Sequence, residues 1–263
     1  MIRLVASDVD GTLLDHHGVL PPARADAVRA LSAAGIPLVL ATGKLWTSVR
    51  ALTDLLDLPG PHVACNGSVV FDADGRLIRT SLLDAAVADE VAAVLAARRI
   101  PHALYLEDGS LVTARLDAAH DVLPVLGEPL PTVAGRSGRG VLKVLAILGP
   151  DDEGELRTLA ADVARVQRTG PRFLEWNAAD ADKATGLATV TELLGIPMGD
   201  VLAVGDAEND VPMLRAAGIG VAVVGASPAA SAAADRTLTL DLADLLLQLA
   251  ATHQLDRPHA SRA

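Results

Sequence analysis

The sequence contains very few aromatic residues, one cysteine and no long apolar run. Phe, Trp and Tyr together make up 2% of the 263 residues, so Ala, Val and Leu must build the core. Cys65 has no partner for an internal disulfide, which makes a cytoplasmic location the default expectation. No apolar run reaches the ~20 residues that a membrane helix needs. The first residues are strand-like and lack the pattern of a secretory signal.

Cations are also scarce. The chain has 22 Lys and Arg against 33 Asp and Glu, a net charge of −11. Such a surface repels nucleic acid and anionic membranes, so we expect neither as a partner. Anionic substrates are disfavoured too, unless a metal ion or local cations reverse the field at one site. The sequence carries no prediction of oligomeric state, and its polar tail, residues 252–263, is expected to fray.

What the sequence does contain is an alternation of strand-like and helix-like segments at both ends. With 51% hydrophobic residues, the chain is expected to fold into one or two domains. Strands that are apolar throughout and alternate with helices predict a parallel sheet covered on both faces, a Rossmann-like α/β core. The predicted strands are residues 2–6, 36–41, 62–65, 201–204 and 219–224, and the predicted helices are residues 21–34, 45–56, 183–194 and 211–217.

The middle of the chain has a different pattern. Residues 105–106, 110–114 and 141–148 are strand-like, residues 153–166 are helix-like, and residues 126–139 are rich in Pro and Gly. These features predict an α+β domain inserted into the sheet domain. The predicted boundaries are 1–83 plus 181–263 for the core and 84–180 for the inserted cap.

Polar residues follow the predicted core strands at the points where they end. In LVASDVDGTLLD, Asp8 and Asp10 lie two residues apart directly after an apolar run, where like charges resist burial. Each such group alone has an ordinary explanation as a turn, a helix cap or a surface charge. Together they would meet at one edge of a parallel sheet, where ligands bind. The other members are Thr42 and Gly43, Asn66 and Gly67, and Asp206 and Asp210, with Lys183 at a predicted helix start.

These residue types favour one chemistry. Clustered carboxylates suit Mg²⁺, which keeps some coordination positions for water or substrate oxygens. Such an ion would offset the repulsion between the acids and attract a phosphoryl group to an acidic protein. The Thr42 hydroxyl and the Lys183 ammonium could hold the other phosphoryl oxygens. Catalysis of phosphoryl transfer consists mostly of positioning and charge stabilisation, which this set would supply.

Four segments resemble the motifs of the haloacid dehalogenase superfamily. They are DVDGTLLD, ATGK, the isolated Lys183 and GDAEND, and NGSVV and AGIGVAVV also fit. More narrowly, the chain is similar to Cof-type phosphatases, which carry a C2B-type α/β cap between the second and third motifs. The resemblance covers almost the whole chain. It implies a Mg²⁺-dependent phosphatase acting on a small phosphorylated metabolite.

The resemblance also implies a role for each carboxylate. Asp8 would be the nucleophile that forms an aspartyl-phosphate, and would also bind the metal. Asp10 would be the general acid and then the general base, and its backbone carbonyl would bind the metal. Asp206 would be a direct metal ligand, and Asn209 and Asp210 would complete or orient the metal shell.

The remaining motif residues would bind the substrate. The resemblance implies that Thr42 and Lys183 bind the transferring phosphoryl group and that Gly43 leaves space at the turn. Lys44 stands where the family usually has Arg, a change that could alter substrate contacts. Further candidates for substrate contact are Asn66 in the core and Glu175, Trp176 and Asn177 in the cap. Trp176 could equally be an ordinary packing residue at the domain junction.

Two other functions stay open at this point. A phosphomutase of the same superfamily would use the same residues with a bisphosphate activator or a retained phospho-enzyme. A receiver-like signalling switch also clusters acids, a hydroxyl and a lysine around Mg²⁺. Its phosphorylated Asp usually ends the third strand, whereas the third strand here ends in Cys65 and Asn66. A receiver also needs no inserted domain of about a hundred residues, so hydrolysis is the preferred hypothesis.

Overall fold

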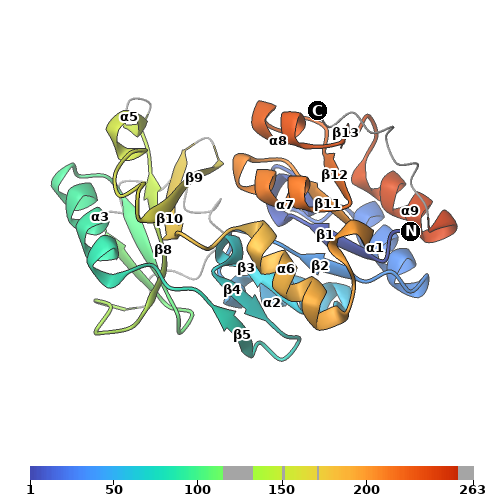
Figure 1. Cartoon of the computed structure of the whole chain (residues 1–263), viewed down its shortest axis with the longest axis horizontal. Coiled ribbons are helices and arrows are strands. Elements are labelled where there is room, and N and C mark those ends of the chain that lie inside the picture. Colours follow the sequence, from blue (N-terminus) through green and yellow to red (C-terminus); the bar gives the residue numbers. More distant parts are fainter. Residues whose placement is uncertain (115–132, 150–151, 171, 254–263) are drawn as a thin grey trace.

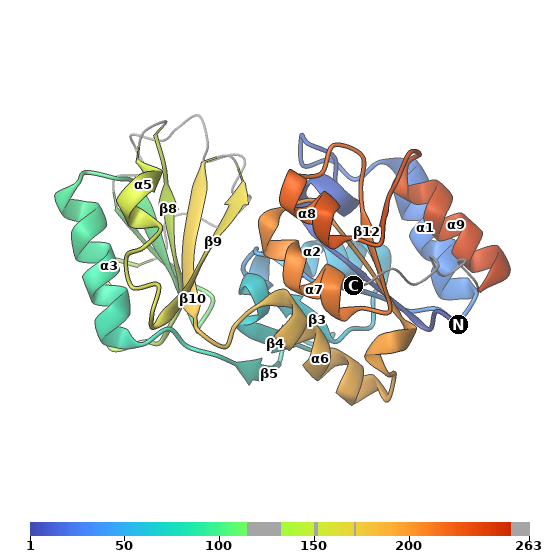
Figure 2. The same cartoon turned by 45° about the horizontal axis from the view of Figure 1, so that its top comes forward.

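The computed structural model describes residues 1–114, 133–149, 152–170 and 172–253, which form two lobes (Figure 1). One lobe, the core, contains a parallel sheet between two layers of helices. The other lobe, the cap, contains an antiparallel sheet with helices α3 and α5 on the side away from the core (Figures 1 and 2). The chain enters the cap after β5 and returns to the core before α6, so the cap is an insertion. The predicted α/β core with an inserted cap is thereby confirmed.

The core sheet has the strand order β13-β12-β11-β1-β2, and all of its pairs are parallel. Its strands are apolar at successive positions because both faces are covered. Leu4 faces one layer of helices and Val5 the other. The strands are β1 (Leu4–Ser7), β2 (Leu38–Leu40), β11 (Val201–Gly205), β12 (Ile219–Ala222) and β13 (Arg236–Thr237).

Two layers of helices enclose this sheet. One layer consists of α1 (Pro22–Ala33), α2 (Trp46–Leu56) and α9 (Leu242–Thr252). The other consists of α6 (Lys183–Leu194), α7 (Val211–Ala216) and α8 (Pro228–Ala233). Helix α6 begins at the predicted residue because the Asp182 side chain accepts a hydrogen bond from Thr185 N, 2.8 Å away. It ends at Gly195, whose left-handed backbone (φ 61°) stops the helix.

The third predicted strand lies in a different sheet from the one expected. β3 (His62–Ala64) pairs antiparallel with β4 (Val69–Phe71), which pairs with β5 (Leu77–Thr80). One parallel bridge, from Ala41 to Val63, joins β3 to the core sheet. The expectation of a full parallel partner was wrong because Asn66 and Gly67 both have positive φ and turn the chain back as a hairpin.

The cap sheet has the strand order β7-β6-β8-β10-β9. Its elements are α3 (Ala85–Ala97), β6 (His102–Leu106), β7 (Leu111–Ala114), β8 (Val141–Ile147), α5 (Glu153–Leu156), β9 (Ala164–Gly170) and β10 (Phe173–Ala178). The predicted helix over residues 153–166 was wrong. Only its first turn is helical, because pairing with β10 makes residues 164–170 an edge strand of the sheet.

Two predictions about flexible segments fall mostly on residues outside the described part. Of the predicted loop 126–139, residues 126–132 lie outside it, and of the predicted frayed tail, residues 254–263 do. Thr252 is the last residue of α9. The numerical domain boundaries stay a prediction. Among the described helices, none is both long and apolar enough to cross a membrane.

Candidate active site

The loop after β1 brings Asp8 next to the end of β11. The Asp8 N–H donates to the Val204 carbonyl, 2.9 Å away, and the chain then turns tightly through residues 9–13. Gly11 has a φ of 79°, and a Cβ there would lie 2.9 Å from Oδ2 of Asp206. Glycine is needed at this point because the turn packs directly against the second acidic loop.

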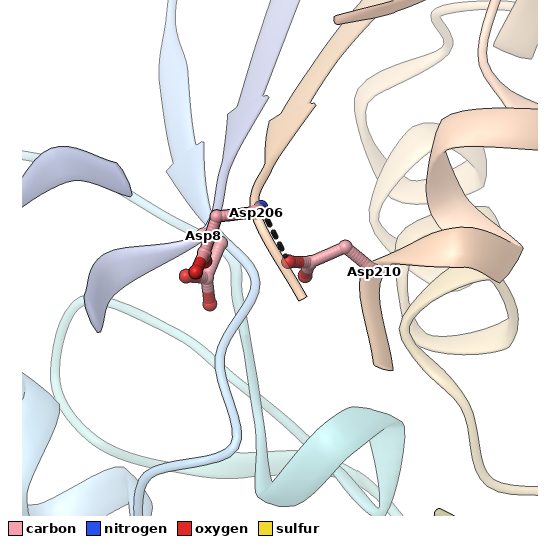
Figure 3. A group of neighbouring side chains, drawn as sticks. All are labelled: Asp8, Asp206 and Asp210. Atoms are coloured by element: carbon pink, nitrogen blue, oxygen red, sulfur yellow. Dashed lines mark hydrogen bonds between the residues drawn. The ribbon is translucent and has the colours of Figure 1, made fainter. Parts of the chain in front are cut away.

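A buried lysine joins the carboxylates beneath the loop. Lys183 Nζ lies 2.6 Å from Oδ1 of Asp8 and 2.6 Å from Oδ1 of Asp210. Oδ2 of Asp210 accepts hydrogen bonds from the N–H groups of Asp206 and Ala207, both 2.9 Å away; the bond from Asp206 is drawn in Figure 3. Asp210 therefore holds the loop that carries Asp206, and Lys183 orients Asp8.

The group retains an excess of negative charge. Burial raises the pKa of Asp8 well above its ordinary value, and Asp210, Asp206 and Asp10 add to this against the attraction of Lys183. Burial also raises the pKa of Asp206 to about 6, with a further contribution from Asp210. For Lys183, burial lowers the pKa, but Asp210 and Asp8 outweigh it and the net pKa is raised. One lysine thus does not neutralise the acids, and a further cation would stabilise the group.

Three carboxylates are placed to accept such a cation. One oxygen from each of Asp8, Asp206 and Asp210 lies within 4.8 Å of the other two (Figure 3). An all-oxygen set suits a hard divalent ion such as Mg²⁺. Thr12 Oγ1 donates to Oδ1 of Asp206, 3.2 Å away, and so fixes that side chain. These residues fit a metal ion.

The structure places the Asp10 side chain apart from this group. Its carboxylate is half exposed and pairs with Lys44 Nζ, 3.2 Å from Oδ2. Among the described carboxylates, it is therefore Asp210, and not the Asp10 side chain, that lies with Asp8 and Asp206 in the group that could hold a metal ion. The role implied for the Asp10 backbone carbonyl stays a prediction. Lys44, which occupies the usual Arg position, contacts a proposed proton-transfer residue.

The turns after β2 and β3 are held against each other. Thr42 N–H donates to Val63 O (3.0 Å), and Asn66 N–H donates to Thr42 O (2.9 Å). The Thr42 hydroxyl oxygen accepts from Lys44 N–H at 3.1 Å. A Cβ at Gly43 would lie 3.1 Å from Oδ1 of Asn66, so the glycine leaves room for the neighbouring turn.

These loops form one wall of a cavity of about 700 Å³, and the cap forms the other. Of the sequence candidates, those that line it are Asp8, Asp10, Thr42, Gly43, Lys44, Glu175, Asp206 and Asn209. Lys183 and Asp210 are fully buried and, among the described residues, lie outside the lining. The lining residues that the sequence left unnoticed include His16 and His17 in the core and Tyr105, Lys143, Thr169 and Phe173 in the cap.

The three cap candidates have different surroundings. Glu175 lines the cavity, whereas Trp176 is fully buried in the cap core and donates from Nε1 to Leu159 O, 2.8 Å away. Adjacent residues of β10 point to opposite faces of the sheet, which explains the difference. The packing interpretation of Trp176 is the one the structure supports. Asn177 lies on the Glu175 face but is buried at the junction, where Nδ2 donates to Cys65 O at 3.1 Å.

Comparison with known proteins identifies the family. A model for haloacid dehalogenase-like hydrolases matches residues 5–241, which contain all of the acidic residues above. The chain belongs to this family. Its fold matches that of a solved subclass IIB sugar phosphatase, BT4131, with a TM-score of 0.83, 22% identity and coverage of 94% of this chain and 98% of that one. The resemblance inferred from the motifs is therefore confirmed.

Two of the curated relatives that this hydrolase resembles are named as phosphatases. A phosphoglycolate phosphatase of Natronomonas pharaonis is 30% identical over 100% of both chains. A 5-amino-6-(5-phospho-D-ribitylamino)uracil phosphatase of Bacillus subtilis is 26% identical over 84% of this chain and 87% of the relative. The substrates named for these two relatives differ in the size and chemistry of the leaving group. Sequence similarity alone therefore does not select a substrate for this chain.

Proposed function

We propose that this hydrolase is a Mg²⁺-dependent phosphatase that cleaves a small phosphorylated metabolite through an aspartyl-phosphate on Asp8. The observation that carries the proposal is the largely buried group of Asp8, Asp206, Asp210 and Lys183, which lies beside a cavity lined by both the core and the cap. Family membership and the names of the curated relatives support hydrolysis over the phosphomutase and receiver alternatives.

The proposed first step is attack by an Asp8 carboxylate oxygen on the phosphorus. The bond between phosphorus and the ester oxygen breaks, and Asp10 supplies a proton to the leaving oxygen. Lys183 holds Asp8 in orientation from below, and Thr42 is placed at the cavity to donate its hydroxyl to a phosphoryl oxygen. The side chains of Asp8, Asp206 and Asp210 would hold the metal, which when bound supplies positive charge next to the phosphoryl oxygens.

In the proposed second step, Asp10 takes a proton from a water molecule. The water oxygen attacks phosphorus, the acyl-phosphate bond breaks, and Asp8 returns as a carboxylate while inorganic phosphate leaves. Asp10 suits both steps because it lines the cavity with a half-exposed carboxylate. Lys44 Nζ lies 3.2 Å from Oδ2 of Asp10 and holds that side chain beside the cavity.

The test is phosphate release from a panel of phosphorylated metabolites. The panel should include sugar and polyol phosphates, phosphoglycolate, nucleotides, pyridoxal phosphate and FMN, each assayed with Mg²⁺ and with EDTA. We expect metal-dependent release from wild type and none from Asp8→Asn. Arg98→Gln, which removes an exposed ion pair on the cap, is the matched control and should retain activity. Release that survives Asp8→Asn at the wild-type rate contradicts the proposal.

A further inference from the structure

The cap sheet presents a buried charge pair to the core. Lys143 in β8 and Glu175 in β10 are 1% and 2% exposed, and Nζ lies 2.8 Å from Oε1. In the register of the sheet, Lys143 lies opposite Tyr105 and Asn177, so all of these residues share the face that looks toward the core. The Lys143 ammonium also lies 4.2 Å from the centre of the Tyr105 ring.

Both charged groups reach across to the core. Lys143 Nζ donates to the backbone carbonyl of Gly43, 2.6 Å away, in the turn that carries Thr42. The second oxygen of Glu175 accepts a hydrogen bond from Nδ2 of Asn66. The first oxygen also accepts from Thr169 Oγ1 at 3.0 Å, so the carboxylate has donors from both lobes.

The chain of bonds continues to the acidic loop. Oδ1 of Asn66 accepts from Nδ2 of Asn209, 2.9 Å away, and Asn209 lies between Asp206 and Asp210 in sequence. Asn66 is fully buried and Asn209 is 5% exposed, so water competes little with these bonds. One continuous network thus connects the middle of the cap sheet with the turn after β2, the turn after β3 and the loop after β11.

We propose that Lys143, Glu175, Asn66 and Asn209, here called the cap bridge, are positioning residues that align the cavity floor only when the cap is seated. This inference rests on the proposed function. A displaced cap would remove the donor to the Gly43 carbonyl and the acceptor of the Asn66 amide. The phosphoryl-binding turn and the Asn209 side chain would then lose their fixed orientation. Cap closure is in this way a condition for the chemistry as well as a barrier to water.

The charge balance of the cap bridge allows its role to be separated from plain stability. Removing Lys143 alone leaves Glu175 buried without its counter-ion. This destabilises the fold whether or not the pair has a positioning role. The double variant Lys143→Met/Glu175→Gln contains neither charge and should regain thermal stability. A positioning role predicts that kcat stays low in this stable double variant.

The experiment compares wild type, both single variants, the double variant and Arg98→Gln. Each is assayed for Tm, for kcat and KM with p-nitrophenyl phosphate and the best metabolite, and for hydrogen exchange in peptides that cover residues 42–46, 65–68 and 206–210. We expect the double variant to lose about tenfold or more in kcat with both substrates, the scale of lost positioning. Its KM should change far less, and exchange in the first two peptides should rise.

Three results would overturn the proposal. Recovery of kcat together with Tm in the double variant would make the pair merely structural. A rise in KM confined to the metabolite would make it a substrate contact. Unchanged exchange in the double variant would show that the cap does not hold the turns. If wild type releases no phosphate at all, the proposed function fails, and hydrogen exchange still decides whether the cap bridge holds the floor.

Discussion

The two lobes each bury a lysine, and the difference between these lysines separates two kinds of site. Lys183 in the core lies between two carboxylates, with a third, Asp206, close by. Lys143 in the cap pairs with one carboxylate and a backbone carbonyl. The core group therefore has unneutralised negative charge and the cap pair is balanced. A group with excess negative charge can bind a cation. A pair whose charges cancel needs no further ion and can hold the two lobes together.

The largest expected effect comes from removing the core lysine. Lys183→Met leaves Asp8 and Asp210 buried without their counter-ion, which should cost about 3–5 kcal/mol of unfolding free energy. Phosphate release should fall by roughly a thousandfold, because the nucleophile loses its orienting cation. Denaturant unfolding measures the loss of stability, and steady-state rates measure the loss of activity.

The cap counterpart Lys143→Met should lose less unfolding free energy and less activity than Lys183→Met, since Glu175 keeps its hydrogen bonds from Thr169 and Asn66. Equal losses in the two variants would contradict the comparison.

Low pH should reduce the stability of the core through His62, a residue outside the catalytic group. His62 in β3 is fully buried, accepts the Leu40 N–H on Nδ1 at 3.2 Å, and burial lowers its pKa to about 4. Its ordinary value is 6.5, so between these values the unfolded chain binds more protons and stability rises with pH. The contribution is complete above pH 6.5 and is lost as pH falls toward 4.

The variant His62→Gln isolates this contribution. Wild type should lose roughly 3 kcal/mol more unfolding free energy than the variant between pH 6.5 and 4, because one pKa unit corresponds to about 1.4 kcal/mol. Denaturant unfolding at a series of pH values measures the difference. Other titrating groups are common to both proteins and cancel. Parallel pH profiles would show that His62 does not stay neutral in the fold.

Metal addition should stabilise the unbalanced group. At about ten times its Kd, Mg²⁺ should add ~1.4 kcal/mol to the unfolding free energy and raise Tm by a few degrees. Asp206→Asn should abolish the rise because it removes the negative charge of one of the three carboxylates that would hold the ion. Arg98→Gln, in an exposed cap ion pair, should retain it. A rise that is equal in Asp206→Asn would place the ion elsewhere.

The smallest expected effect belongs to an ion pair at the edge of the two lobes. Arg157 in the cap contacts Glu208, which lies in the acidic loop of the core, and both side chains are more than one-third exposed. Water and salt screen such pairs, so Arg157→Gln should change stability by ~0.5 kcal/mol or less. Its effect on KM should vanish at high ionic strength. A salt-independent loss as large as that of Lys143→Met would make the edge contact, and not the cap bridge, the main connection.

The core side of the cavity was predictable from sequence, whereas among the described cap residues that line it only Glu175 was expected. Polar residues at the ends of apolar runs mark one edge of a parallel sheet, so Asp8, Thr42 and Asp206 could be grouped before their positions were known. Antiparallel strands have no comparable rule for where a site lies. A cavity can lie against any residue on one face of an antiparallel sheet, so the strand ends do not mark it. Lys143 had a signal, a lone charge within the apolar run GVLKVLAIL, but its partner depends on the pairing of β8 with β10.

Alternation also decides which of two neighbours reaches the site. Glu175 and Trp176 are adjacent in sequence, and only the strand register assigns one to the cavity and the other to the cap core. The helix expected over residues 153–166 failed for a similar reason. Its apolar spacing is helical, but the edge of the cap sheet recruits residues 164–170 as β9. Both outcomes depend on tertiary pairing, which no local pattern contains, and for residues 164–170 that pairing overrode the local helical preference.

The most direct test of the central claim is to trap the phosphorylated enzyme. Wild type with Mg²⁺ and its best substrate should be quenched rapidly in acid, digested and analysed by peptide mass spectrometry. The account predicts a phosphoryl group on Asp8 that appears within the first turnover, disappears as substrate is consumed, and is absent from Asp8→Asn. Rapid phosphate release with no adduct on the peptide that contains Asp8, or with the adduct on another residue, would contradict it.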